Sequence, residues 1–135
     1  MKIAILGTVH PKGLEFLKNN EFEVFEVDNF EIQSLKKSLK NVDGILLRTS
    51  KLDQDILKHC DNLKIISRHG VGYDNVDLDF LNKNKIALGI TSTSNAASVS
   101  EHVMSFFIYL TKNLSLSDSS VSYTHLRAHE TCHNL

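Results

Sequence analysis

A chain of 135 residues can bury one ordinary hydrophobic core, which favours a single main domain. Hydrophobic residues make up 41% and charged residues 23% of the sequence, proportions typical of a soluble globular protein. The formal net charge of −1 gives no electrostatic footprint for nucleic acid or an anionic membrane. Because no stretch approaches the roughly 20 apolar residues of a membrane span, we expect a cytoplasmic protein with neither kind of partner.

Five short runs rich in β-branched and aromatic residues predict strands. Most of them are apolar almost throughout, which is typical of parallel strands that are covered on both faces. In the second run, Glu23 and Glu26 alternate with apolar residues, and this pattern favours an edge strand. The predicted strands span residues 3–6, 22–27, 44–47, 63–67 and 86–90.

Segments with helical spacing lie between and after these strands, at residues 11–18, 30–39, 53–59 and 78–84. Pro11 suits a first helical turn, and Asn29 and Asp53 are candidate N-caps. Five strands that alternate with helices over about 90 residues predict a small, doubly wound, parallel five-stranded α/β sheet.

A longer helix is predicted from Asn95 to Lys112, a stretch without Pro or Gly. Much of its circumference is apolar, and such a helix requires burial on more than one side. A five-unit sheet can cover only one side, so we expect this helix to extend past the sheet. In the isolated chain it should expose Phe106, Phe107 and Leu110 and cause self-association.

The composition changes near the end of the chain, where residues 115–135 lack an apolar period and predict a disordered tail. Residues 122–131 resemble a translated sequencing adaptor, which suggests a non-native origin. Residues 129–133 match the HExxH motif of zinc proteases, and His125 offers a third ligand. Because no amphipathic helix or cleft wall surrounds the motif, we interpret it as accidental and expect no metal site.

The strongest functional signal lies in residues 65–77, where a strand runs into a turn bracketed by Gly70 and Gly72. Acidic and amide residues after this turn are predicted to open the helix at residues 78–84. That layout directs the backbone N–H groups of Val71 and Gly72 toward a place where a carboxylate can bind. The dinucleotide fingerprint itself is absent, because Asn75 replaces its third glycine and no acidic residue ends the next strand.

Arg48 ends the third predicted strand, at the carboxyl edge where open α/β sheets bind their ligands. Two interpretations stand for it, a charge clamp on a carboxylate or phosphate and a solvated strand-end cation. Arg68 and His69, just before the glycine turn, are interpreted as structural hydrogen-bonding residues. If Val71 and Gly72 hold a carboxylate, their N–H groups should share an edge with Arg48 and face it.

Three segments, residues 70–77, 86–91 and 95–103, resemble the D-isomer-specific 2-hydroxyacid dehydrogenases in order and spacing. The branch that they resemble most is D-3-phosphoglycerate dehydrogenase. The resemblance implies a flavodoxin-like substrate (catalytic) domain over residues 1–94. It also implies a crossover helix over residues 95–114, toward an NAD-binding Rossmann domain that this sequence lacks.

The same resemblance implies reversible hydride transfer between C2 of a small 2-hydroxy acid and NAD. It assigns the substrate carboxylate to the amides of Val71 and Gly72, with Val71 also beside the nicotinamide. Arg48 would meet the substrate, and Asn95 would line the same cleft. The family's dinucleotide glycines and its catalytic Arg, Glu and His would lie beyond residue 116. We therefore expect a truncated, inactive fragment of an enzyme that forms a homodimer or a larger assembly.

Other classes of small α/β protein are also considered. A phospho-receiver requires acidic residues after its first and third strands, where Thr8, His10 and Arg48 stand. A flavodoxin requires a hydroxyl-rich phosphate loop, and residues 9–11 make a poor one. A non-catalytic binding or dimerisation module of dehydrogenase ancestry stays open as the alternative.

Overall fold

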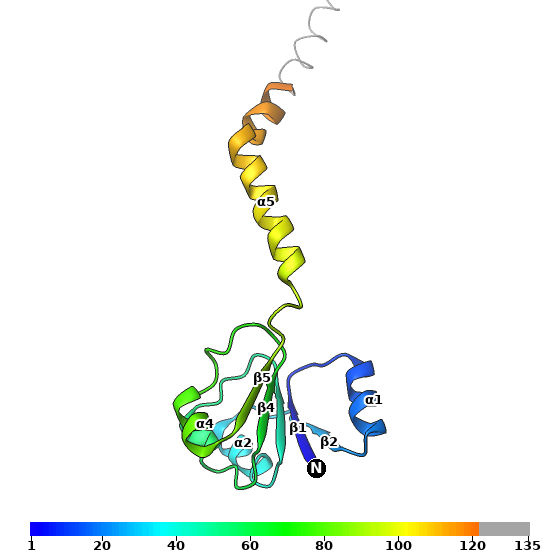
Figure 1. Ribbon diagram of the computed structural model, residues 1–135, viewed down its shortest axis with the longest axis vertical. Coiled ribbons are helices and arrows are strands. Elements are labelled where there is room, and N and C mark those ends of the chain that lie inside the picture. The colour runs from blue at the N-terminus through cyan, green and yellow to red at the C-terminus, as the bar shows by residue number, and fades with distance from the viewer. Residues whose placement is uncertain (122–135) are drawn as a thin grey trace, which may run out of the picture. The chain divides into compact units, whose positions relative to one another are not determined.

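The computed structural model describes residues 1–121 and divides the chain into two compact units, the first of which is Met1–Ser94. The first unit is built on a five-stranded, all-parallel sheet with the strand order β2-β1-β3-β4-β5 (Figure 1). Its strands are β1 (Lys2–Leu6), β2 (Glu23–Glu26), β3 (Gly44–Leu47), β4 (Ile65–Arg68) and β5 (Ala87–Ile90). The predicted doubly wound sheet is therefore confirmed, and β2 is an edge strand as its alternating glutamates indicated.

Four helices connect the strands: α1 (Pro11–Asn19), α2 (Ile32–Ser38), α3 (Gln54–Leu57) and α4 (Leu78–Asn84). Pro11 occupies the first turn of α1, and the carboxylate of Asp53 caps α3 by accepting from the Ile56 N–H at 3.3 Å. Both predictions are thus confirmed. The caps of α1 and α4 are the side chains of His10 and Asp77.

The prediction that Asn29 caps the second helix is wrong. The N-cap of α2 is Glu31, and Asn29 lies two residues before it. The Asn29 side chain accepts from the Glu31 N–H at 2.9 Å, which closes a local turn and leaves the helix to begin later. An asparagine can form either arrangement with its own backbone, and sequence alone does not choose between them.

The hydrophobic core lies on one face of the sheet, beneath α2, α3 and α4. From the strands come Ala4, Leu6, Ile45, Leu47 and Ile66, all of which are almost completely buried. From the helices come Leu35, Ile56, Leu57 and Leu81. Figure 1 shows α1 on the opposite side of the strands from α2 and α4, and no residue of α1 belongs to this core.

The second unit begins at Asn95 and contains α5 (Ala96–Lys112). Its side chains are exposed along the whole helix, including Phe106 at 55%, Phe107 at 66% and Leu110 at 74%, as predicted. Residues 114–121 are also helical, which differs from the unstructured tail expected from residue 115. Within residues 1–121, no helix is long and apolar enough to cross a bilayer.

Candidate functional site

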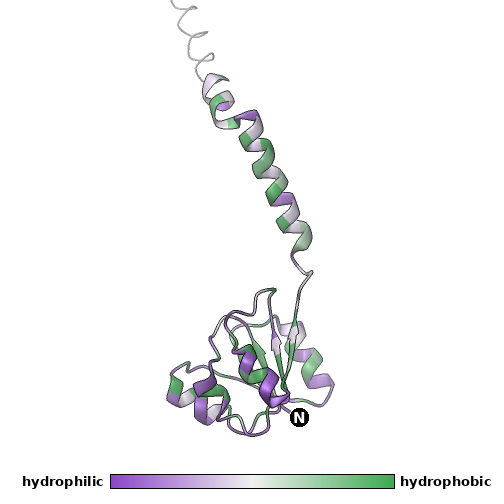
Figure 2. Cartoon of the chain, turned by 60° about the vertical axis from the view of Figure 1, so that its left-hand side comes forward, coloured by the Kyte–Doolittle hydropathy of each residue, from purple (hydrophilic) through white to green (hydrophobic). Residues whose placement is uncertain are grey.

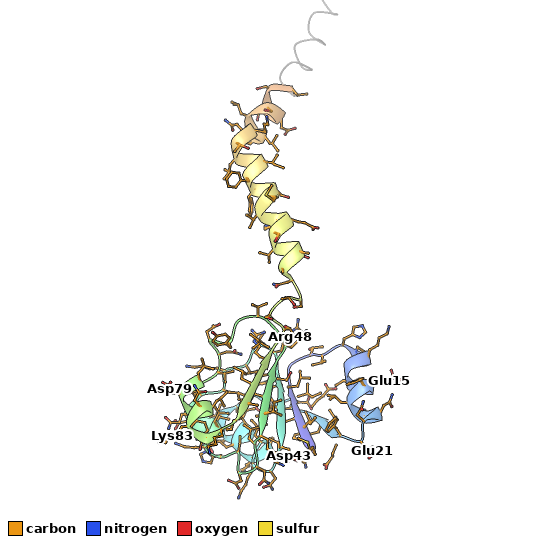
Figure 3. The ribbon with its side chains drawn as sticks, in the orientation of Figure 1. Glu15, Glu21, Asp43, Arg48, Asp79 and Lys83 are labelled. Carbon is orange, nitrogen blue, oxygen red and sulfur yellow. The ribbon has the colours of Figure 1, made fainter. Side chains whose placement is uncertain are left out.

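The carboxyl ends of the parallel strands place the sequence-predicted residues at one edge of the sheet. Arg48 follows β3, and its N–H donates to the Leu6 carbonyl at the end of β1. His69 follows β4 and donates its N–H to Leu47 O at 2.8 Å. Figure 3 shows Arg48 at the opposite end of the sheet from Asp43. The loop that carries Val71 and Gly72 starts at this edge too.

The glycine turn leaves two backbone donors open. The N–H of Gly70 donates to the Arg68 carbonyl at 2.9 Å, and the Gly70 carbonyl accepts from Thr91 at 3.1 Å, so both polar groups of Gly70 are used. Among residues 1–121, no hydrogen bond is formed by the N–H of either Val71 or Gly72. Both residues are exposed, so their N–H groups are available to an incoming anion.

Gly70 has a backbone conformation that favours glycine, with φ of +156°. A Cβ atom there would also collide with Nη1 of Arg68, whose guanidinium lies against the turn. Because a long side chain can move aside, the dihedral angle is the stronger reason for glycine. The turn is thus a fixed backbone feature that presents its next two residues outward.

The helix that follows the turn begins where the spacing predicted, and the acidic residue Asp77 caps it. The segment from residue 69 to residue 77 is a loop, and α4 begins only at Leu78. The Asn75 side chain donates to the Ser50 carbonyl at 2.9 Å, and Val76 forms an isolated parallel bridge with Leu52. Tertiary hydrogen bonds therefore hold this segment in place, and no helix dipole reinforces the N–H groups of the turn.

The loop after β3 is joined to the glycine loop by the same contacts. In addition to the Asn75–Ser50 bond, the Leu52 N–H donates to Asn75 O at 2.9 Å, and the Asp77 N–H donates to Leu52 O at 3.3 Å. Arg48 stands at the start of one loop and Val71 in the other. Their backbones are therefore held in a defined relation, which a two-point anion site requires.

Arg48 is exposed at the rim of the sheet and packs over the turn after β1. Its Nη1 donates to the Thr8 carbonyl at a long 3.4 Å. A Cβ at Gly7 would lie 3.0 Å from the Arg48 Cβ, and Gly7 has φ of +105°, so glycine is required there. The guanidinium keeps most of its donors free, which suits a charge clamp as well as a solvated cation.

Arg68 adds a second guanidinium at this edge, and sequence reasoning undervalued it. Its Nη1 donates to the His69 carbonyl, as expected of a structural residue. Its Nε is buried and has no hydrogen-bond partner among residues 1–121. A buried donor without an acceptor is costly, so the local hydrogen bond does not fully account for this side chain.

Asn95 stands at the start of the second unit, where it is the N-cap residue of α5 and its side chain makes no capping bond. Its role in lining a substrate cleft stays a prediction. The HExxH segment at residues 129–133 and His125 lie outside the described residues. Within residues 1–121, no group of three or more His, Cys, Asp or Glu side chains is arranged to hold a metal ion.

Two hollows elsewhere on the first unit do not suit an anionic substrate. One, of about 240 Å³, is lined by three carboxylates, Asp53, Asp74 and Asp77, against the single cation Lys51, so its net charge is negative and disfavours a carboxylate. The other, of about 290 Å³, contains Cys60, and burial raises the pKa of this thiol to about 11. A thiol with so high a pKa is protonated and unreactive at neutral pH. The cationic rim at Arg48 is therefore the better candidate site.

The described residues do not fit a dinucleotide. A nucleotide pyrophosphate is held where a glycine-rich turn leads directly into a helix, with an acidic residue at the end of the following strand. Here a loop follows the turn, and Ile90 and Thr91 stand at the end of β5. The only predicted cofactor contact is Val71, whose exposed side chain offers one apolar surface.

The family model and the most similar sequences indicate the same protein family. The family model for the catalytic domain of D-isomer specific 2-hydroxyacid dehydrogenases matches residues 3–134, beyond the residue 114 that the sequence motifs indicated. A putative 2-hydroxyacid dehydrogenase of Staphylococcus saprophyticus is 31% identical over 114 residues, which are 82% of this chain and 35% of that protein. A D-3-phosphoglycerate dehydrogenase of Mycobacterium leprae is 31% identical over 111 residues, 82% of this chain and 20% of that protein.

Solved structures agree with the sequence matches. A protein of Pyrococcus horikoshii superposes with a TM-score of 0.81 at 27% identity, over 91% of this chain and 37% of that one. An NAD+-bound 3-phosphoglycerate dehydrogenase of Entamoeba histolytica superposes with a TM-score of 0.68 at 28% identity, over 81% of this chain and 38% of that one. The chain spans between 20% and 38% of the length of these relatives. It belongs to the D-isomer specific 2-hydroxyacid dehydrogenase family, through the catalytic domain of that family.

Proposed function

We propose that this chain is the substrate-binding part of an NAD-dependent oxidoreductase that acts on the CH–OH group of a D-2-hydroxy acid. The observation that carries the proposal is the pair of open N–H groups on Val71 and Gly72, at the same edge of the sheet as Arg48. Two backbone donors match the two oxygens of a carboxylate, and a guanidinium supplies the compensating charge.

The proposed reaction is reversible oxidation of the hydroxyl carbon next to the carboxylate, with NAD as the redox partner. Because residues 1–121 hold no dinucleotide-binding turn, the part played by this chain is to bind and orient the acid. The family resemblance adds Val71 beside the nicotinamide and Asn95 in the cleft. On this basis the 135-residue chain alone binds weakly and does not turn over.

A phosphorylated acid of the phosphoglycerate type is the finer form of the proposal. Arg48 and Arg68 bring two guanidinium groups to one edge, and Nε of Arg68 has no acceptor among the described residues. A carboxylate held by the loop amides leaves these cations for a second anionic group on the same substrate. D-Glycerate and 3-phosphoglycerate differ in this group alone, so they test it.

The test is titration of the ¹⁵N-labelled full chain with D-glycerate and with 3-phosphoglycerate, followed by amide chemical shifts. We expect the largest shifts at Val71 and Gly72 with both acids, and tighter binding of the phosphorylated one. Arg48→Gln should weaken binding about tenfold, because a charge-assisted hydrogen bond is lost. Lys51→Gln is the matched control, since it removes an exposed cation from the same loop.

Three results would contradict the proposal. Shifts that spread over the surface without a maximum at Val71 and Gly72 would show that the turn holds no carboxylate. Equal weakening by Arg48→Gln and Lys51→Gln would show that only the general charge matters. NADH oxidation by the 135-residue chain in the presence of 2-oxo acids would overturn the assignment of a purely binding role.

A further inference from the structure

Arg68 forms two hydrogen bonds with the glycine turn that follows its own strand. Its Nη1 donates to the carbonyl of His69, and its own carbonyl accepts from the N–H of Gly70 at 2.9 Å. The His69 carbonyl and the Gly70 N–H belong to one peptide unit, which is planar and rigid. Arg68 therefore clamps this unit at both of its polar ends, once with its side chain and once with its backbone.

The next peptide unit, between Gly70 and Val71, is fixed from the other side. Its carbonyl accepts at 3.1 Å from the N–H of Thr91, the residue directly after β5. In a trans peptide the carbonyl and the N–H point in opposite directions. Because β4 lies between β3 and β5, a carbonyl directed at the end of β5 turns the Val71 N–H toward the side of β3, which ends at Arg48.

The guanidinium of Arg68 occupies a position that is unfavourable for Arg68 itself. Its Nε is buried without an acceptor among residues 1–121, a cost that a solvated arginine avoids. A Cβ atom at Gly70 would collide with Nη1, so the guanidinium fills the space directly beside the turn. A side chain that is held at a cost to stability calls for an explanation in the site that it supports.

The charge of Arg68 is not neutralised within the described part of the chain. Among residues 1–121 the ion pairs are formed by lysines, and none includes Arg68. Its guanidinium lies against Gly70, the residue before the two open N–H groups, and a positive charge there favours a bound carboxylate. Since α4 begins too late to direct a dipole at the turn, Arg68 supplies the positive potential that a helix N-terminus supplies in other anion sites.

We propose that Arg68 is a positioning residue of the candidate site. By clamping the peptide unit between His69 and Gly70, it fixes the direction in which Val71 and Gly72 present their N–H groups, and its charge strengthens their hold on a carboxylate. This role rests on the proposed function, in which the two N–H groups bind the carboxylate of the substrate. It extends to acids that carry no second anionic group.

The first test measures N–H bond directions in the free chain, from residual dipolar couplings of the ¹⁵N-labelled 135-residue protein. We expect Arg68→Met to change the couplings of Val71 and Gly72 and to leave those of β1 and β3 unchanged, because the stem stays and the clamp is lost. Arg48→Gln is the matched control, since it removes a guanidinium at the same edge that donates to the Thr8 carbonyl instead. The protein is kept dilute, because the exposed hydrophobic residues along α5 favour self-association (Figure 2).

The second test measures the binding of D-glycerate, which has no phosphoryl group, by amide chemical shifts. We expect Arg68→Met to weaken binding about tenfold and Arg68→Lys to weaken it no more than about threefold. The lysine ammonium keeps the charge and can donate to the His69 carbonyl, so it should rescue most of the loss. Thermal unfolding of each variant checks that the first unit stays folded.

Two results would overturn the proposal while the proposed function stands. One is a set of unchanged couplings at Val71 and Gly72 in Arg68→Met. The other is weaker binding of 3-phosphoglycerate alone, which would make Arg68 a ligand of the phosphoryl group. Failure of the proposed function has a different signature, because the wild type itself would then show no maximum of shifts at Val71 and Gly72 with D-glycerate. Changed couplings in Arg68→Met would in that case still support Arg68 as the residue that orients the turn.

Discussion

Two neighbouring isoleucines on β4 offer a direct test of how the sheet is covered. Ile66 is completely buried in the core, whereas Ile65, the preceding residue, is 40% exposed on the other face of the sheet. Truncation to alanine removes three carbons in each case. At about 0.8 kcal/mol per buried methylene, Ile66→Ala loses about 2.4 kcal/mol, and the residual cavity raises this to roughly 3–4 kcal/mol.

For Ile65→Ala the same arithmetic gives a smaller loss. About three fifths of the side chain is buried, which scales the transfer term to roughly 1.4 kcal/mol, and an open surface leaves no cavity. The common loss of β-propensity cancels between the two variants. We therefore expect a difference of about 2 kcal/mol between them.

The assay is hydrogen exchange of the backbone amides of β3, which reports on the sheet independently of α5. It is run at low protein concentration, so that self-association does not change the cost of truncating Ile65. Equal losses of protection for the two variants would refute the assignment of Ile65 to an uncovered face. A larger loss for Ile65→Ala would show that the core lies on the other side.

Three further results are expected. The Lys64 ammonium and the Lys2 N–H hold the pKa of Asp43 below its usual 3.8, so Lys64→Gln should raise this pKa in an NMR titration. The contribution of the Asp43–Lys64 ion pair to stability is present above pH 3.8, and it is lost as the pH falls through the lowered pKa of Asp43. Asp77→Ala should destabilise the sheet by about 1 kcal/mol in urea unfolding because it removes the N-cap of α4, whereas Asn29→Ala, which caps no helix, should cost less. Deletion of residues 117–135 should leave thermal unfolding of the first unit unchanged, and tight stoichiometric zinc binding that disappears on deletion would revive the HExxH interpretation.

Much of the fold could be predicted because its signals are local. Strand β3 (Gly44–Leu47) and helix α4 (Leu78–Asn84) have the predicted bounds, and the other elements differ by a few residues at their ends. Apolar runs separated by helical spacing leave few alternatives to a doubly wound sheet. The position of β2 at the edge followed from two glutamates that a central strand would have to bury.

The errors occur where the sequence allows more than one local arrangement. Asn29 is a suitable N-cap residue, but its side chain accepts from the Glu31 N–H and α2 begins only at Ile32. The sequence also gives no sign of the cap of α1, where Nδ1 of His10 accepts from the Lys12 N–H at 3.2 Å. Histidine is an unusual cap, so its composition signal is weak.

The loop between the glycine turn and α4 limits what the candidate site can do. A helix N-terminus would add a fixed dipole to the turn, and without it the site has two backbone donors and the charge of its arginines. Two donors orient a planar carboxylate but bind it weakly in an exposed position. Under the proposed function, weak binding at this edge is sufficient, because the acid needs a defined orientation relative to a redox partner that another part of the enzyme holds.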